Sequence, residues 1–505
     1  MNADSSLSNL DVDGATVAFG ANGYHTLSMA GDLTGSGTFD MNTDLSTLQT
    51  DLILVGGQAY GAHTLVVADS GKEAGGDQLR VVGTQGSPGA FSLYGEHVDA
   101  GAYRYVLERQ GNDWYLVASG KNVVGPVDPT DPVDPDQPST GPGDGGEPGT
   151  TTPDPGDGGN ENGNQGGTEG GDQGATDGGS QGGSNGGDQG SSGGGSTSQP
   201  DIISKGSNVA LGMQSAAANL YYAELGTLVQ RLGELRLSQD EGGVWIRGIG
   251  KRMRMGEHYG RAFEQNLDGV EIGADKAIHL DGARLYLGAM VGASESRIRF
   301  TENSRGHLDS TSVGAYATYL RDDGWYLDNV IKYSHMDGDV KVPTNLGQPV
   351  KGDYKADAYG VSVEGGKRID LQDQWFVEPQ VQLSATHFEG PRYTSSDGLK
   401  VRASDTDSLQ GRLGVRGGKE IQLDRDMRLQ TYATASYIDE LAGNTHVRVN
   451  GEKLNNRLPG SRGELGAGAA LQVSRQQKVS LEVDYAKGDH LEQPWAVTLG
   501  YRYLW

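Results

Sequence analysis

The chain of 505 residues has no cysteine, which excludes disulfides, thiolate metal sites and a cysteine nucleophile. The absence also suits a protein that crosses an oxidising compartment, where free thiols crosslink. Hydrophobic residues make up only 35% of the chain, and no run of about 18–20 apolar residues occurs, which excludes a helical membrane span. The net charge of −26 argues against nucleic-acid binding, because neutralising phosphates requires a basic surface.

A middle segment lacks lysine, arginine and aromatic residues altogether. Residues 125–200 hold 13 Asp or Glu, 25 Gly and 10 of the 17 Pro. This composition cannot build a core and predicts a disordered spacer. Its Asp-Pro repeats favour semi-extended chain, and its Gly/Ser/Asn part favours flexible coil.

The N-terminal part is predicted to be all-β. Short apolar runs recur every ten to twelve residues, with Gly, Asp and Ser between them. This spacing fits either a β-sandwich or the stacked rungs of a β-solenoid. The runs are Ala15–Phe19, Thr26–Met29, Leu52–Val55, His63–Val67, Leu79–Val82, Phe91–Tyr94, Tyr103–Leu107 and Trp114–Val117.

One helix is expected at 208–237, with Ser207 as its candidate cap. Leucines recur there at i+3/i+4 spacing, and proline is absent. Its polar residues make it unfit to face lipid, so a helix of a soluble bundle is one alternative. These residues include Gln214, Glu224, Gln230, Arg231, Glu234 and Arg236.

From Gly243 onward we expect only strands, most of them longer than the ~5–6 residues usual in soluble proteins. Twelve are predicted, at 243–255, 263–279, 282–301, 306–321, 324–340, 353–369, 374–389, 404–422, 426–441, 461–475, 478–490 and 495–505.

Apolar and polar residues alternate along several of these strands. Val270 and Ile272 share one face of a strand, while Glu271 and Asp275 share the other. An apolar face toward lipid and a polar face toward a wet lumen is typical of a transmembrane β-barrel. A β-sandwich would have shorter strands and a larger aromatic core. The residues predicted to line the lumen wall are Glu271, Asp275, Glu364, Glu378, Glu482 and Asp484.

The connections also differ in length. Tight turns are expected at 280–281 and 322–323, and long polar loops at 341–352, 390–403 and 442–460. Short turns on one side and long loops on the other are a barrel asymmetry. Because the N-terminus lacks the basic and apolar regions of a signal peptide, a barrel implies a truncated N-terminus.

The last strand places apolar residues at every second position from Trp495 to the terminal residue, Trp505. In a barrel such a strand closes the sheet against the first strand and removes both edges. The end of the chain resembles the C-terminal signal by which the outer-membrane assembly machinery recognises nascent barrels. The residues that carry this signal are Thr498, Gly500, Tyr501, Tyr503 and Trp505.

Two strings near the end of the N-terminal part resemble a known family. Gly101-Ala102-Tyr103-Arg104-Tyr105-Val106-Leu107 and Gly111-Asn112-Asp113-Trp114-Tyr115-Leu116-Val117 look like the last rungs of a pertactin-like autotransporter passenger. In that family this region is a β-helix end cap, often called the autochaperone segment, followed by a Pro-rich linker. The resemblance makes Tyr103, Tyr105, Trp114 and Tyr115 the candidate end-cap residues.

The C-terminal part resembles the autotransporter β-domain, closest to the pertactin class. The sequences that support this resemblance include Arg231-Leu232-Gly233-Glu234, Gly242-Gly243-Val244-Trp245, Trp375-Phe376-Val377-Glu378-Pro379 and Gly500-Tyr501-Arg502-Tyr503. The resemblance implies a twelve-stranded antiparallel barrel with one helix threaded through its pore. We therefore expect an all-β protein with a β-solenoid end at 1–124, a disordered acidic linker at 125–204, a pore-spanning helix at 205–237 and a barrel at 238–505.

The function implied by the resemblance is type V secretion. The barrel would lie in the outer membrane of a Gram-negative bacterium as a monomer and export its own passenger to the cell surface, with folding outside driving export. The expected partners are outer-membrane lipid, the barrel-assembly machinery and periplasmic chaperones. No Ser/His/Asp arrangement, nucleotide loop or metal-ligand cluster is evident in the sequence, so neither an enzyme nor a cofactor is expected.

Three alternatives stay open. The protein could be a surface-anchored adhesin or virulence factor whose barrel is mainly an anchor, with host-surface ligands for the passenger. A plain pore without secretion is a second alternative. Release of the passenger by cleavage is the third. Some family members cut themselves at a paired-Asn segment of the pore helix, but that position here holds Gly226-Thr227, which has no amide side chain that could cyclise. Cleavage by another route, or by an external protease in the linker, stays open.

Overall fold

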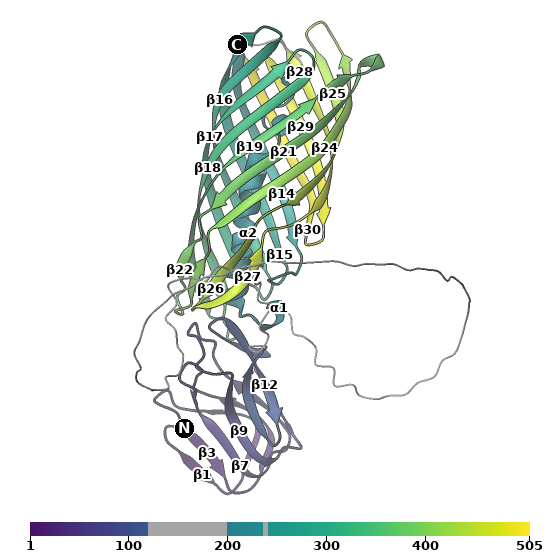
Figure 1. Cartoon of the computed structure of the whole chain (residues 1–505). Helices are drawn as coiled ribbons and strands as arrows, with labels where there is room; N and C mark the ends of the chain where they lie inside the picture. The colour runs from purple at the N-terminus through teal and green to yellow at the C-terminus, as the bar shows by residue number, and fades with distance from the viewer. Residues whose placement is uncertain (120–198, 236–240) are drawn as a thin grey trace, which may run out of the picture. The chain divides into compact units, whose positions relative to one another are not determined.

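The computed structural model describes residues 1–119, 199–235 and 241–505 (Figure 1). Most of the linker predicted at 125–204, and Arg236 of the predicted helix, lie outside the described residues. The fold class is all-β, as the sequence predicts, with few helices. No described helix is long and apolar enough to cross a membrane.

The N-terminal residues form a β-solenoid, one of the two architectures that the sequence left open. Strands of one sheet pair in parallel, with Leu27 opposite Ile53 and Ile53 opposite Val82. The strands of the second sheet, β2, β4, β8 and β10, also pair in parallel, and Phe39 and Leu65 from these strands join the same fully buried core as Ile53. The solenoid strands are β1 (Ser5–Leu7), β2 (Leu10–Ala18), β3 (Thr26–Met29), β4 (Leu33–Asp40), β5 (Thr43–Asp44), β6 (Gln49–Thr50), β7 (Leu52–Gln58), β8 (Ala62–Val66), β9 (Gln78–Gly86) and β10 (Ala90–Leu93).

The last three strands of the solenoid reverse the pairing. They are β11 (His97–Ala100), β12 (Tyr103–Gln110) and β13 (Asp113–Ala118), and they pair antiparallel with one another and with β9. Tyr105 and Leu116 from this hairpin are fully buried in the solenoid core. The hairpin covers the edge of the last parallel rung, which would otherwise present unpaired backbone groups.

Twelve long antiparallel strands form a closed barrel. The first, β14, pairs with both β15 and the last strand, β30, so the sheet has no free edge. Outward apolar side chains such as Val270, Ile331 and Leu413 are exposed, as a lipid-facing surface requires. The barrel strands are β14 (Gly242–Met255), β15 (Phe263–Leu280), β16 (Ala283–Phe300), β17 (Arg305–Arg321), β18 (Trp325–Pro343), β19 (Pro349–Lys367), β21 (Trp375–Phe388), β24 (Thr406–Gln422), β25 (Arg428–Glu440), β28 (Arg462–Ser474), β29 (Gln477–Gly488) and β30 (Leu491–Leu504).

Two of the three expected long loops contain further strands. The connection after β18 is only residues 344–348, because β18 and β19 extend farther than predicted and take up most of the expected loop 341–352. The segments after β21 and β25 supply a four-stranded sheet that the sequence analysis treated as polar loops. Its strands are β22 (Arg392–Thr394), β23 (Lys400–Ala403), β26 (Asn444–Val449) and β27 (Glu452–Arg457). Near the short turn after β19 lie β20 (Ile369–Asp370) and a 3-10 turn, η2 (Gln372–Gln374).

The single helix predicted at 208–237 is wrong in one respect, because the chain forms separate helices. They are α1 (Gln199–Ile202), α2 (Lys205–Leu225) and α3 (Leu228–Leu232), and Figure 1 shows α2 inside the barrel. Gly226 has φ +60°, a backbone conformation that ends α2, and a Cβ atom there would lie 2.6 Å from Nη1 of Arg247.

The caps of the two longer helices follow from nearby hydroxyl side chains. The Thr227 hydroxyl caps α3 in a capping box with Gln230. The cap of α2 is Ser204 and not the predicted Ser207, because the Ser204 Oγ accepts a hydrogen bond from the Ser207 backbone N–H at 3.1 Å.

Candidate functional site

The candidate site is the interior of the barrel, where α2 and α3 meet the inner wall. The six acidic residues predicted to line the lumen are all buried, none of them more than 6% exposed. All six contact the pore segment or a wall residue that does. Asp275 does so only through the wall, because it binds Arg502 and accepts a hydrogen bond from the hydroxyl of Tyr316, whose ring lies under Arg231.

The first cluster of buried charges surrounds Glu224 near the end of α2. The Glu224 carboxylate lies 3.1 Å from Nζ of Lys332, which is also 2.7 Å from Oε1 of Glu271. Arg247 donates to Glu271 at 2.8 Å, and its guanidinium also donates to the Glu224 carbonyl. Two acids and two bases balance each other here, which is the condition under which charges tolerate burial.

The second cluster joins α3 to the wall strands β17, β18 and β19. Arg231 and Asp328 form an ion pair of 2.6 Å, with both side chains at most 2% exposed. The Arg231 guanidinium also lies over the Tyr316 ring, 5.0 Å from its centroid. The Leu228 backbone N–H, in the first turn of α3, donates to Glu364 at 2.9 Å. A carboxylate is favoured there, because the first N–H groups of a helix have no partner within it.

The third cluster lies just beyond α3. Arg416 reaches Glu234 at 2.8 Å and Glu378 at 3.0 Å, and all three side chains are 1% exposed. Gln230 donates to Glu482 at 2.7 Å and to Asp484 at 3.4 Å. Four of the five predicted pore-helix residues therefore contact the wall, and the fifth, Arg236, lies outside the described residues.

The basic residues of the wall were not predicted from the sequence, and neither was the acidic wall residue Asp328. Each partner stands at an inward position of an alternating strand, so the pattern that found the acids could also have found the bases. A buried arginine or lysine costs several kcal/mol unless a carboxylate faces it, and the same holds for a buried carboxylate without a base. The predicted inward carboxylates therefore implied inward basic residues, and this implication was not used. The missed residues are Arg247, Lys332, Arg416 and Arg502.

The residues predicted as the C-terminal assembly signal divide between the two faces of β30. Tyr501, Tyr503 and Trp505 point outward and are 37–53% exposed, while Thr498 points inward and is buried. Gly500 lies opposite Arg247 in the pairing of β30 with β14 that closes the barrel.

The predicted end-cap residues lie on β12 and β13. Tyr105 donates its hydroxyl to the Gly76 carbonyl at 2.8 Å, and Trp114 packs edge-on against Phe91 at 5.6 Å. Tyr115 is half-buried, and Tyr103 donates to Glu452 of β27 at 3.2 Å.

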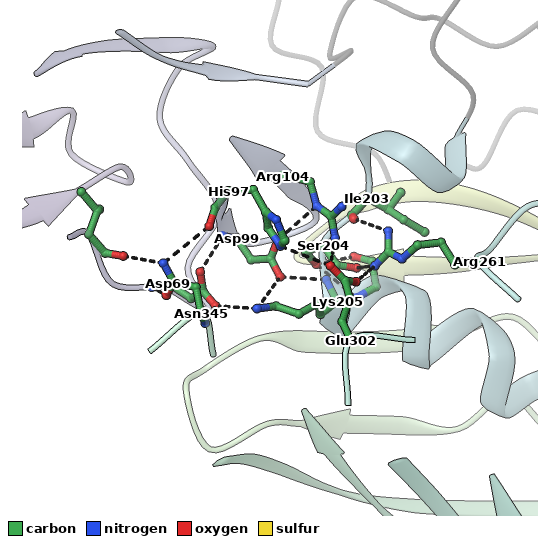
Figure 2. A network of polar contacts seen from close by, with 12 residues as sticks. Asp69, His97, Asp99, Arg104, Ile203, Ser204, Lys205, Arg261, Glu302 and Asn345 are labelled. Atoms are coloured by element: carbon green, nitrogen blue, oxygen red, sulfur yellow. Dashed lines mark hydrogen bonds and ion pairs between the residues drawn. The ribbon is translucent and has the colours of Figure 1, made fainter. Parts of the chain in front are cut away.

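Lys205, the first residue of α2, binds two solenoid aspartates (Figure 2). Its ammonium lies 3.1 Å from Oδ2 of Asp69 and 3.8 Å from Oδ2 of Asp99, and its backbone N–H donates to Asp99 at 2.9 Å. Lys205 is 5% exposed. Burial raises the pKa of both aspartates, and the Lys205 ammonium opposes that shift.

Further contacts surround this pair in Figure 2. Asn345, in the turn after β18, donates its backbone N–H to Asp69 at 2.6 Å and its side-chain amide to the Val67 carbonyl at 2.6 Å. Arg104 of β12 and Arg261 both pair with Glu302, at 2.7 and 3.0 Å. No group of three or more His, Asp or Glu side chains that could hold a metal occurs among the described residues.

Comparison with known proteins gives matches to both parts of the chain. The family model "Autotransporter beta-domain" matches residues 244–486, and the model "Pertactin" matches residues 3–118. The pertactin autotransporter of Bordetella parapertussis is 38% identical over 96% of this chain and 50% of its own length. The autotransporter adhesin/invasin TibA of Escherichia coli is 32% identical over 99% of this chain and 49% of its own length. The chain thus spans about half the length of these relatives.

Among solved structures, the chain is similar to the β-domain of the Bordetella autotransporter BrkA. The two are 31% identical, with a TM-score of 0.45, and the match covers 52% of this chain and 99% of that one.

Proposed function

Because the chain belongs to the autotransporter family, with a pertactin-like passenger end and an outer-membrane β-barrel, we propose that the barrel exports its own passenger and that α2 and α3 then plug the pore. In this proposal residues 1–124 are the end of the passenger, 125–204 the linker, 205–237 the pore segment and 238–505 the barrel. The barrel lies in the outer membrane and the passenger at the cell surface.

The observation that carries the plug is the set of three buried ionic clusters between the helices and the wall. Each one joins a residue of the pore segment to an opposite charge on the wall, as with Glu224 and Lys332, Arg231 and Asp328, and Glu234 and Arg416. A helix with this surface is costly in lipid and in a dry core, but is favourable inside a lumen of complementary charge.

Passenger folding supplies the driving force in this proposal, because the periplasm has no ATP. Once outside, the antiparallel hairpin β12–β13 buries Tyr105 and Leu116 in the solenoid core. A rung stabilised in this way cannot slide back through the pore, and its parallel edge templates the next rung.

The proposed partners follow from the barrel. Lipid covers its apolar outer face, and the aromatic end of β30 is the segment that the barrel-assembly machinery and periplasmic chaperones would meet. We propose a monomer, because closure of β14 on β30 leaves no barrel edge for a second copy.

We also propose that the chain neither cuts itself nor acts as an enzyme. At the helix break, Gly226 and Thr227 offer no side-chain amide to attack the backbone. Relatives are named as pertactin and as adhesin/invasin autotransporters, which supports a binding role for the complete passenger. If purified barrel gains a new N-terminus near Thr227 on incubation, the absence of self-cleavage is wrong.

To test export, the chain is expressed behind a secretory leader with an epitope tag at its N-terminus. Protease is then added to intact cells, so that only what lies outside the cell is digested. We expect the tag to be digested while the barrel stays protected. A matched control lacks residues 491–505, and so cannot close the barrel and should display nothing. A folded barrel whose tag stays protected until the outer membrane is opened would refute export.

A further inference from the structure

Four basic residues lie side by side on the outer wall of the barrel. Arg299 of β16 stands opposite Arg305 of β17, Arg305 stands opposite Lys341 of β18, and Lys341 stands opposite Lys351 of β19. All four are exposed. One unbroken row of positive charge therefore crosses four neighbouring strands.

A second row continues on the sheet formed by β22, β23, β26 and β27. Arg392 stands opposite Arg402, Arg402 opposite Arg448, and Arg448 opposite Lys453. The other face of this sheet is buried, so these side chains point outward like those of the first row. The two rows are adjacent, because the Ser396 backbone N–H, next to β22, donates to the Lys351 carbonyl at 2.7 Å. We name these eight residues the basic collar.

The collar is electrostatically unfavourable by itself. Like charges directly opposite each other on neighbouring strands destabilise a sheet. Lys341 has an ion pair with Asp339 at 3.1 Å, but the described residues provide no ion pair for Arg305, Arg392 or Arg402. Residues 201–505 hold 36 Lys or Arg against 40 Asp or Glu, so an unbroken row of basic residues is not a consequence of composition. It calls for an anion from outside the chain.

The collar lies at the loop end of the barrel, on the side of the cell exterior. Figure 1 shows β22, β26 and β27 at the end opposite the C-terminus, and long loops of such barrels face outward from the cell. The exposed aromatics Tyr333 and Tyr359 stand at the top of the apolar surface, and Lys341 and Lys351 lie eight residues farther along the same strands. At ~3.3 Å per residue and a strand tilt of about 40°, the collar stands roughly 20 Å above the edge of the hydrocarbon.

A row of carboxylates separates the collar from the membrane. Asp268, Glu295, Asp309 and Asp337 stand opposite one another on β15 to β18. Basic neighbours pair with several of these acids, as Arg297 does with Glu295 and Lys355 with Asp337, so this band carries little net charge, whereas the collar holds an excess of basic residues. The anionic partner therefore presents its charges at the height of the collar. This height corresponds to the sugars of a glycolipid rather than to its acyl-chain boundary.

We propose that the basic collar binds the phosphate and carboxylate groups on the core sugars of the lipopolysaccharide that surrounds the barrel. The collar runs along the side of the barrel wall and its side chains point away from the barrel, so its partner lies beside the barrel, as outer-leaflet glycolipid does. Arginine suits this ligand, because its guanidinium binds phosphate and carboxylate oxygens in pairs.

The test uses the full chain, folded in detergent, and lipopolysaccharide with a phosphorylated core. The collar variant is R299A/R305A/K341A/K351A. The matched control, R321A/K367A/K419A, removes three outward basic residues at the other end of the barrel. From the usual worth of exposed ionic contacts, loss of four of them should weaken binding by the collar variant roughly 4- to 900-fold, and the control should bind about as the wild type does. Binding should also weaken as salt rises.

Heat-modifiable migration in gels shows whether each variant folds. If the fourfold variant does not fold, the double variant R305A/K341A replaces it in the binding assay. Equal binding by wild type and collar variant would overturn the proposal. Lipopolysaccharide with an unphosphorylated, uncharged core that binds equally well would also overturn it. If heparin competes as effectively as phosphorylated lipopolysaccharide, the partner is a soluble polyanion and the glycolipid assignment is wrong. Because the readout is binding, the result is independent of whether the barrel exports a passenger.

Discussion

Replacing Arg231 by methionine should open the plugged pore. Arg231 and Asp328 pair at 2.6 Å with side chains only 1% and 2% exposed. Removing one partner of a buried ion pair costs about 3–5 kcal/mol, because the other charge stays buried without compensation. At ~1.4 kcal/mol per tenfold, the ratio of plugged to unplugged barrels should fall roughly 100- to 3000-fold. Single-channel conductance in planar bilayers measures this directly.

Two further variants show whether the reasoning is right. R231M/D328L replaces both charges by apolar groups, which is often neutral for a buried pair, so it should restore closure. Arg297 and Glu295 form a pair of 2.7 Å on the outer surface, 61% and 34% exposed. R297M should therefore leave conductance unchanged. If R231M stays as closed as the wild type, or if the double variant leaks as much as R231M, the ionic clusters do not hold the plug.

Three other predictions concern the passenger end and the last strand. Burial, helped by Arg104, lowers the pKa of His97 to about 4. The contribution of His97 to the stability of β11–β12 is therefore complete above pH 6.5 and should be lost as the pH drops toward 4. The loss should be at most about 3 kcal/mol. Hydrogen exchange of this hairpin against pH measures the loss, which H97Q should abolish. The buried aspartates beside Lys205 have raised pKa values, so they act in the opposite sense and favour the folded state as pH falls through those values. Replacing Trp114 and Tyr115 by serine should lower the stability of the end cap by about 2–4 kcal/mol, by analogy with other truncations of large aromatic residues. The displayed passenger should then be less resistant to protease. Unchanged resistance would count against a capping role. Deleting Trp505 should slow barrel assembly, which would appear as fewer heat-modifiable barrels in the membrane fraction. Normal assembly would show that Trp505 is not part of the assembly signal.

The barrel was predictable because its signal is repeated. Lipid on one side and a polar lumen on the other impose a two-residue alternation on every strand, so Val270 and Glu271 alone define two faces, and twelve such strands reinforce one another. The closing contact could also be foreseen, because apolar residues at every second position from Trp495 mark the last strand as one more strand of the barrel, which pairs with the first. The parallel rungs of the solenoid were not decidable, because short alternating strands look the same in a sandwich.

Features that depend on a single distant partner escaped the sequence. The break at Gly226 follows from a close approach to Arg247, which the chain places 21 residues later on another element. The small sheet is built from strands of three to six residues drawn from two loops, and neither loop has enough alternation to be noticed alone. The inward bases could be found from alternation, but which of them meets Glu224 and which meets Glu234 could not, since pairing across a lumen depends on closure of the whole barrel.

Because these ion pairs form only in a closed barrel, we expect the barrel to close before the helices plug it. The helix residues find their partners on strands far apart in the chain, Lys332 on β18 and Arg416 on β24. A half-built set of buried charges is worse than none, because each unpaired member costs several kcal/mol. The helices can therefore settle only in a barrel whose wall is already complete. Apolar residues of the pore segment, such as Leu228 and Leu232, also pack against the wall. The charged side chains keep the segment compatible with water while the barrel is still open, as the proposed passage of a chain through the lumen requires.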